Sequence, residues 1–273
     1  MRRMIFARAI LIGVIVAAAG HSKTAIADAG ASWRLAEDSL ATDIRAEEKH
    51  TKEVLASSNI VSDFTGLINK HFKSSPDRKL EDIKVILGSG RNPYVNIDAN
   101  EIFLPYGYLT YAIKSHAELE ESGEAALSRA LDTVEYSLYH LFGHLVAKDN
   151  SSDSDDTAEA VASWLMIKGF TNGGEQWFAD ADAFGRASQL MDGPPEDYWH
   201  EHSLYKLRQQ TINCWILGSA PERYGNLFKS VRGTALELQQ RTKRCIDEWN
   251  TLDLQLKSML QDNLKTDSIL LTK

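Results

Sequence analysis

The chain has 273 residues, of which 43% are hydrophobic and 25% are charged. This balance is typical of a folded globular protein and excludes a disordered or collagen-like chain. The formal net charge is -8, from 30 lysines and arginines against 38 aspartates and glutamates. Because a negatively charged chain does not attract phosphate backbones, the composition argues against a nucleic-acid partner.

The first residues carry the pattern of an export signal. Arginines flank an apolar run over residues 10–19, and residues 25–27 read Ala-Ile-Ala, the small residues of a cleavage site. We therefore expect residues 1–27 to be a signal peptide and residues 28–273 to form a single domain of a secreted or periplasmic protein. The apolar run is too short to span a bilayer, so no integral membrane segment is expected after cleavage.

The cysteine content restricts the covalent chemistry. Only Cys214 and Cys245 are present, which excludes a disulfide-scaffold miniprotein and any four-cysteine metal site. They leave one bridge or two free thiols. Since an exported protein folds under oxidising conditions, we predict that the two form a single disulfide.

Hydrophobic periodicity predicts a mostly helical α+β fold. Helical spacing extends from Trp33 to about Phe72 and is broken at residues 74–77. The β-prone runs at residues 83–87 and 101–104, with residues 94–97 between them, predict a small sheet. After Pro105 helical spacing dominates, with one linker-like stretch at residues 149–154.

The clearest helix is predicted from about Glu124 to Val146. Leucines and a valine recur at steps of four and three and form one apolar stripe, which should face the sheet and the core. This stripe consists of Leu127, Leu131, Val134, Leu138, Leu141 and Leu145. His140 and His144 lie beside it, one turn apart on the same face. Two such imidazoles can bind one zinc ion, although a pair satisfied by hydrogen bonds is the alternative.

A second helix is predicted to follow the linker, and it begins with acidic residues. Asp155 and Glu159 lie one turn apart on it. One carboxylate could complete a His-His-carboxylate metal site, while the other holds a ligating imidazole through its free N–H. Alternatively, the acidic residues at its start only cap the helix and favour its positive end.

These segments resemble a bacterial family of secreted, metallopeptidase-like proteins of unknown function. The run from Tyr139 to Val146 is similar to that family's H-E-x-G-H helix, and the helix from Asp155 is similar to its acidic motif. The other segments that agree in order are Asn92-Pro93-Tyr94, Glu101–Tyr106, Tyr198–Leu204, Arg208, Cys214 and Gly218–Pro221. The resemblance covers about residues 64–249.

The resemblance implies a zincin-like fold with a zinc site and a peptide or protein as substrate or partner. His140 and His144 would be metal ligands, and either Asp155, preferred by its position, or Glu159 would supply the third. His202 would be a candidate for stabilising the transition state. The strand Glu101–Leu104 would be the sheet edge that receives an extended peptide.

The sequence departs from the family pattern at the catalytic base. Leu141 occupies the position of the glutamate that activates the zinc-bound water. The substitute bases in the sequence are Glu135, which points to another face of its helix, and Glu201, which lies on another segment. Arg208 is expected to form a buried ion pair.

Three functions remain open at this point. The first is a catalytically impaired family member, in effect a pseudoenzyme, that binds a peptide or protein partner and retains some affinity for zinc. The second is an active zinc hydrolase with a relocated base. The third is a metal-free structural or interaction protein.

Overall fold

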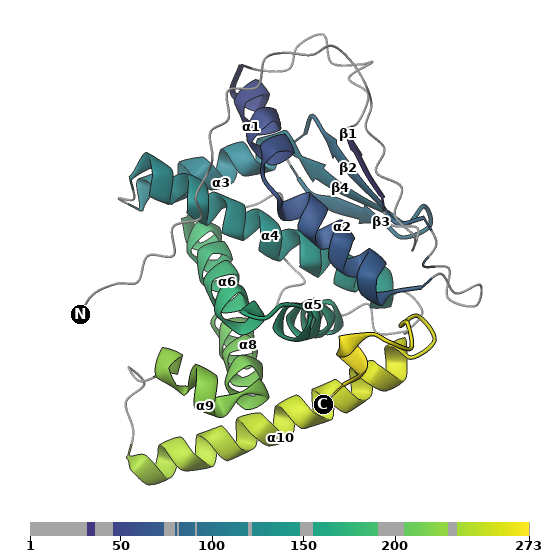
Figure 1. Ribbon diagram of the computed structural model, residues 1–273. Coiled ribbons are helices and arrows are strands. Elements are labelled where there is room, and N and C mark those ends of the chain that lie inside the picture. Colours follow the sequence, from purple (N-terminus) through teal and green to yellow (C-terminus); the bar gives the residue numbers. More distant parts are fainter. Residues whose placement is uncertain are drawn as a thin grey trace.

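The computed structural model describes residues 32–35, 46–73, 80, 82–90, 92–119, 122–147, 155–190, 205–228 and 234–272. The expected signal peptide, the break at residues 74–77 and the linker at residues 149–154 lie outside these residues. Figure 1 shows a mostly helical molecule with a small sheet on one side of α4 and helix α10 along the opposite end. This is the α+β class that the sequence predicts.

The element bounds follow chain order. The strands are β1 Ser32–Leu35, β2 Lys84–Gly88, β3 Tyr94–Asn96 and β4 Glu101–Pro105. The α-helices are α1 Ala46–Ser57, α2 Ile60–His71, α3 Tyr106–Glu118, α4 Gly123–Ala147, α5 Asp155–Gly169, α6 Gly173–Leu190, α8 Tyr205–Ser219, α9 Pro221–Tyr224 and α10 Ala235–Leu260. Two short 3-10 helices, η1 Gly225–Phe228 and η2 Ile269–Leu271, complete the description.

The sheet has four strands in the order β1-β2-β4-β3. Strands β1, β2 and β4 run parallel, and β3 runs antiparallel to β4. Alternate residues of β2 and β4, namely Val85, Leu87, Ile102 and Leu104, are fully buried. The prediction that Glu101–Leu104 form an edge strand is wrong. Because the chain turns back before β4, β3 pairs with the outer side of β4 and is itself the edge.

The prediction of one helical segment from Trp33 to Phe72 is also wrong in its first part. Trp33 lies in β1 and pairs with Val85 of β2, so tertiary pairing overrides a weak local pattern. The helical part is divided into α1 and α2. The division falls at a pair of serines: Ser57 and Ser58 donate side-chain hydrogen bonds to carbonyls of the preceding turn, and such bonds compete with continuation of a helix.

Helix α4 lies at the centre of the molecule. It contacts α2, α3, α5 and α6 and, on the remaining side, β3 and β4. Residues 132–143 are therefore buried without interruption, where the sequence predicted a single apolar stripe. Of that stripe, Val134, Leu138, Leu141 and Leu145 are buried, whereas Leu127 and Leu131 near the start of α4 are half-buried.

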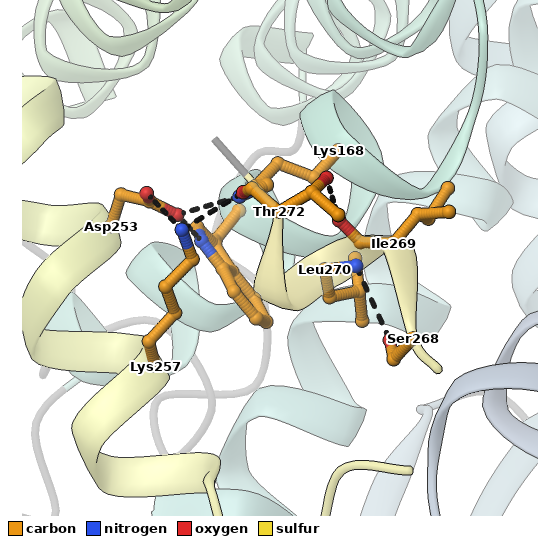
Figure 2. Close-up of polar contacts among 8 residues, drawn as sticks. Lys168, Asp253, Lys257, Ser268, Ile269, Leu270 and Thr272 are labelled. Carbon is orange, nitrogen blue, oxygen red and sulfur yellow. Dashed lines mark hydrogen bonds and ion pairs between the residues drawn. The ribbon is translucent and has the colours of Figure 1, made fainter. Parts of the chain in front are cut away.

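The segment after α10 folds back beside the end of α10 (Figure 1) and is fixed to α5. The carbonyl of Thr272 accepts hydrogen bonds from the Nζ atoms of Lys168 on α5, at 2.6 Å, and Lys257 on α10, at 2.9 Å. Asp253 bonds both ammonium groups, and its Oδ1 also accepts from the Trp164 indole. Figure 2 shows Asp253, Lys257 and Lys168 gathered around Thr272. These contacts join α5 to α10.

Helices α8 and α10 are joined covalently. Cys214 and Cys245 form a disulfide, which confirms the sequence prediction. No helix in the described part of the chain combines the length and the apolar composition needed to cross a bilayer.

Removing this disulfide should destabilise the fold. The bridge closes a loop between residues 31 positions apart and restricts the unfolded chain. The double variant Cys214→Ser, Cys245→Ser should lose about 2–4 kcal/mol in the free energy of unfolding, measured by urea titration against the oxidised wild-type protein. An unchanged midpoint would contradict the prediction. Mass spectrometry without reductant should find no thiol that can be alkylated.

A buried histidine should make stability depend on pH. Burial, assisted by Arg186 and Arg129, lowers the pKa of His116 to about 4, against ~6.5 in an unfolded chain. The unfolded state therefore binds more protons than the folded state below pH 6.5. The contribution of neutral, buried His116 to the free energy of unfolding is thus complete above that pH and is lost as the pH falls toward 4. The loss should be on the order of 3 kcal/mol.

Urea titrations between pH 4.5 and 7.5 test this dependence. His116→Gln should have a smaller loss of stability on acidification than the wild-type protein. The matched control is His50→Gln, because His50 is exposed on α1. If the free energy of unfolding changed equally with pH in His116→Gln and in the wild-type protein, His116 would not be the source of the dependence.

Candidate functional site

The two predicted histidines meet in the second half of α4. His140 is buried and His144 is half-buried, and their Nε2 atoms are 3.2 Å apart. Two nitrogens that each bind one tetrahedral zinc ion at ~2.1 Å stand roughly 3.4 Å from one another. The observed separation is close to this value and is compatible with a shared metal ion.

Glu159 of α5 lies on the other side of the His140 ring. Its Oε2 is 3.4 Å from Nδ1 of His140 and accepts hydrogen bonds from the Tyr136 hydroxyl and from Nη2 of Arg208, the latter at 2.5 Å. Glu159, His140 and Arg208 are all buried. Arg208, on α8, thus forms the buried ion pair that the sequence predicts.

This environment fixes the charges of the site. Burial alone would raise the pKa of Glu159, but Arg208, followed by His140 and Tyr136, brings it down to about 2. Burial lowers the pKa of His140, and Glu159 acts in the opposite direction. At neutral pH the carboxylate is ionised and the imidazole is neutral, which is the form that binds metals.

A glycine brings the two helices of the site together. A Cβ atom on Gly143 would lie 2.2 Å from the carbonyl oxygen of Ala158, so only glycine allows this approach of α4 to α5. Ala158 directly precedes Glu159. The glycine of the His140–His144 motif therefore positions the carboxylate beside the first histidine.

Of the remaining predicted site residues, some are described by the structure and others are not. Leu141 is buried with an exposed fraction of 2%, and Glu135 is buried on α4, where its charge acts on Tyr139. The side chain of Asp155, and both Glu201 and His202, lie outside the described residues. Among the residues that are described, no group of three or more histidines, cysteines, aspartates or glutamates forms a metal site.

Sequence reasoning missed two residues of the site. Tyr136 stands one turn before His140 and reads as an ordinary core aromatic. Gly143 gave a detectable signal, since a glycine inside a long helix costs about 1 kcal/mol relative to alanine and usually has a packing reason.

The close contact of α4 and α5 can be tested by adding one methyl group. Gly143→Ala should lower the free energy of unfolding by about 1–3 kcal/mol, because the methyl group meets backbone that cannot move aside cheaply. The matched control is Gly66→Ala on α2, where no atom lies within 4 Å of the added Cβ. That variant should be neutral or more stable by up to about 1 kcal/mol. Equal effects at the two glycines, measured by urea titration, would refute the argument.

One of three comparisons with known proteins finds a match. A search of the curated proteins and a search of the solved structures each find no match. Among protein families, residues 42–260 match the family described as "Putative metallopeptidase". The match includes α4, α5 and α8, which carry the site. The chain therefore belongs to this metallopeptidase family.

Proposed function

We propose that this protein is a zincin-like member of its family that binds an extended peptide or protein segment without hydrolysing it. The observation that carries the proposal is the buried Leu141 at the position of the general base. A leucine cannot accept the proton of an attacking water, and the loss of general-base catalysis typically lowers a rate by 10²–10⁴-fold.

Glu159 does not replace the missing base. A general base works best when its pKa lies near the working pH, whereas Arg208 and its other partners hold the pKa of Glu159 at about 2. Its Oε2 is also engaged by Arg208 and Tyr136. These contacts suit a group that orients the His140 ring through Nδ1.

The histidine pair retains a capacity for zinc in this proposal. The 3.2 Å between the Nε2 atoms of His140 and His144 supports them as ligands, and Asp155 is the candidate for a third. In this arrangement Glu159 would orient the His140 ring through Nδ1. The sequence also allows a second arrangement, in which Glu159 is itself a ligand. A bound zinc ion would supply a Lewis acid.

The edge strand β3 is the proposed contact for the peptide. One side of β3 pairs with β4, and β3 also lies beside α4, which carries the histidines. Tyr94 on this strand is 53% exposed and stacks on Phe103. An extended peptide can add to such an edge by backbone hydrogen bonds. The disulfide supports function in an oxidising compartment, as a secreted or periplasmic protein.

The proposal is tested by restoring the base. Wild-type protein loaded with zinc should bind a fluorescent pool of unstructured peptides but should not cleave it. Leu141→Glu should gain zinc-dependent cleavage, by 10²-fold or more over the wild-type protein. Leu141→Gln is the matched control, because it has the same shape and polarity without the base.

Zinc-dependent cleavage by the wild-type protein would contradict the proposal and favour an active hydrolase. Peptide binding that is lost on substituting Tyr94 would support β3 as the contact. Zinc titration of His140→Ala, Asp155→Ala and Glu159→Ala, each checked for folding by circular dichroism, identifies the ligands.

A further inference from the structure

Helix α10 carries the two most exposed large apolar side chains in the described part of the chain. Leu254 has an exposed fraction of 68%, and Leu236 has one of 62%. The two leucines are 18 positions apart, which is five full turns of an α-helix, so they lie on the same side of α10. Single exposed leucines are common on protein surfaces. The alignment of these two is therefore the feature that needs a cause.

A regular pattern of exposed residues joins the two leucines. It has alternating steps of four and three, which is the spacing of residues that face a partner helix in a coiled coil. These six residues, which we call the outer face of α10, are Leu236, Gln240, Lys243, Asp247, Asn250 and Leu254. All of them lie within about 40° of the direction opposite the buried Cys245. The outer face thus points away from α5 and α8, which contact the other side of α10 (Figure 1).

The order of residues on the outer face is self-complementary when two copies of α10 meet in opposite directions. About a midpoint at Cys245, Leu236 of one copy lies opposite Leu254 of the other. Lys243 of each copy likewise lies opposite Asp247 of the other, so opposite charges meet twice. A parallel arrangement would instead place lysine against lysine and aspartate against aspartate. The charges therefore favour the antiparallel pair.

The remaining residues of this surface are compatible with the same pairing. Gln240 lies opposite Asn250, and the amide groups of both can donate and accept hydrogen bonds. Polar pairs of this kind specify the register of two helices at some cost in stability. Arg244, beside the outer face, is already paired with Glu248 of its own helix at 3.5 Å. The two charges of the outer face cancel, although the whole chain has a net charge of -8.

Both ends of α10 are fixed, so the outer face is a preformed surface. At the start, the side chains of Thr234 and Glu237 form a reciprocal capping box around the first turn, which contains Leu236. Near the other end, Asp253 is paired with Lys168 of α5 at 2.9 Å. A surface that is already ordered loses little conformational entropy when it binds.

We propose that the outer face of α10 is a dimerisation surface, which packs against the same face of a second copy as an antiparallel, two-fold symmetric pair of helices. A contact of this symmetry is the commonest in homo-oligomers. It spans only about 27 Å of helix, and small contacts of this kind belong to weak, transient complexes. We therefore expect a dimer that dissociates at micromolar concentrations. Because α10 lies at the end opposite the sheet (Figure 1), β3 of both copies stays uncovered.

Sedimentation velocity on the purified protein, from about 5 to about 500 µM, tests this association. The wild-type protein should change from monomer to dimer as its concentration rises. Lys243→Glu leaves only acidic charges on the outer face, and Asp247→Lys leaves only basic ones. Each variant should weaken the dimer at least tenfold, and an equimolar mixture of the two should associate again. The matched control is Lys49→Glu at an exposed position of α1, which changes the net charge equally and should leave the dimer unaffected.

Cross-linking tests the direction of the two helices. Leu236→Cys and Leu254→Cys, mixed and oxidised, should form a disulfide between the two variants, whereas neither variant alone should form a cross-linked dimer. A wild-type protein that stays monomeric over the whole concentration range would overturn the inference. So would a dimer that Lys243→Glu leaves unchanged, or cross-links of each cysteine variant with itself. None of these measurements requires zinc or a peptide, so the result is separate from that of the Leu141 variants.

Discussion

The burial of residues 132–143 of α4 on all sides is the constraint on which the rest of this structure depends. Helices pack around it and two strands cover the remaining side, so each polar group in its middle turns needs a partner inside the protein. Thr133 meets His116, Ser137 meets Tyr108, and His140 meets Glu159. The contact of His140 with Glu159 in the candidate site is therefore one of several that satisfy the buried polar side chains of α4.

The sequence predicts the parts of this arrangement that depend on local spacing. The histidines share a face because they are four residues apart, and the strands and the helix after residue 154 follow from periodicity and from turn residues. The contacts between elements could not be predicted from the sequence in this way. Trp33 joins a strand because β2 is available as a partner, and neither the edge position of β3 nor the bond from Tyr136 to Glu159 leaves a trace in spacing.

The ion pair of Glu159 and Arg208 explains how the architecture of the site can persist without catalysis. Removing one partner of a buried pair typically costs 3–5 kcal/mol, since the other charge is left buried and uncompensated. At position 141, by contrast, a buried leucine contributes about 1.5–3 kcal/mol through its apolar surface. Under the proposed function, selection for folding alone would retain the surroundings of His140 after the base was lost.

The return of the chain after α10 has a consequence for the order of folding. Lys265 donates to the carbonyl of Asn69 across a sequence separation of 196 residues, and Ser268 bonds His71 across 197. Closing a flexible loop of that length costs on the order of 5 kcal/mol in chain entropy, so these bonds become favourable only after the intervening helices have shortened the path between the two segments. The contacts between α2 and residues 263–268 should therefore form late in folding, after almost all of the rest of the chain has folded.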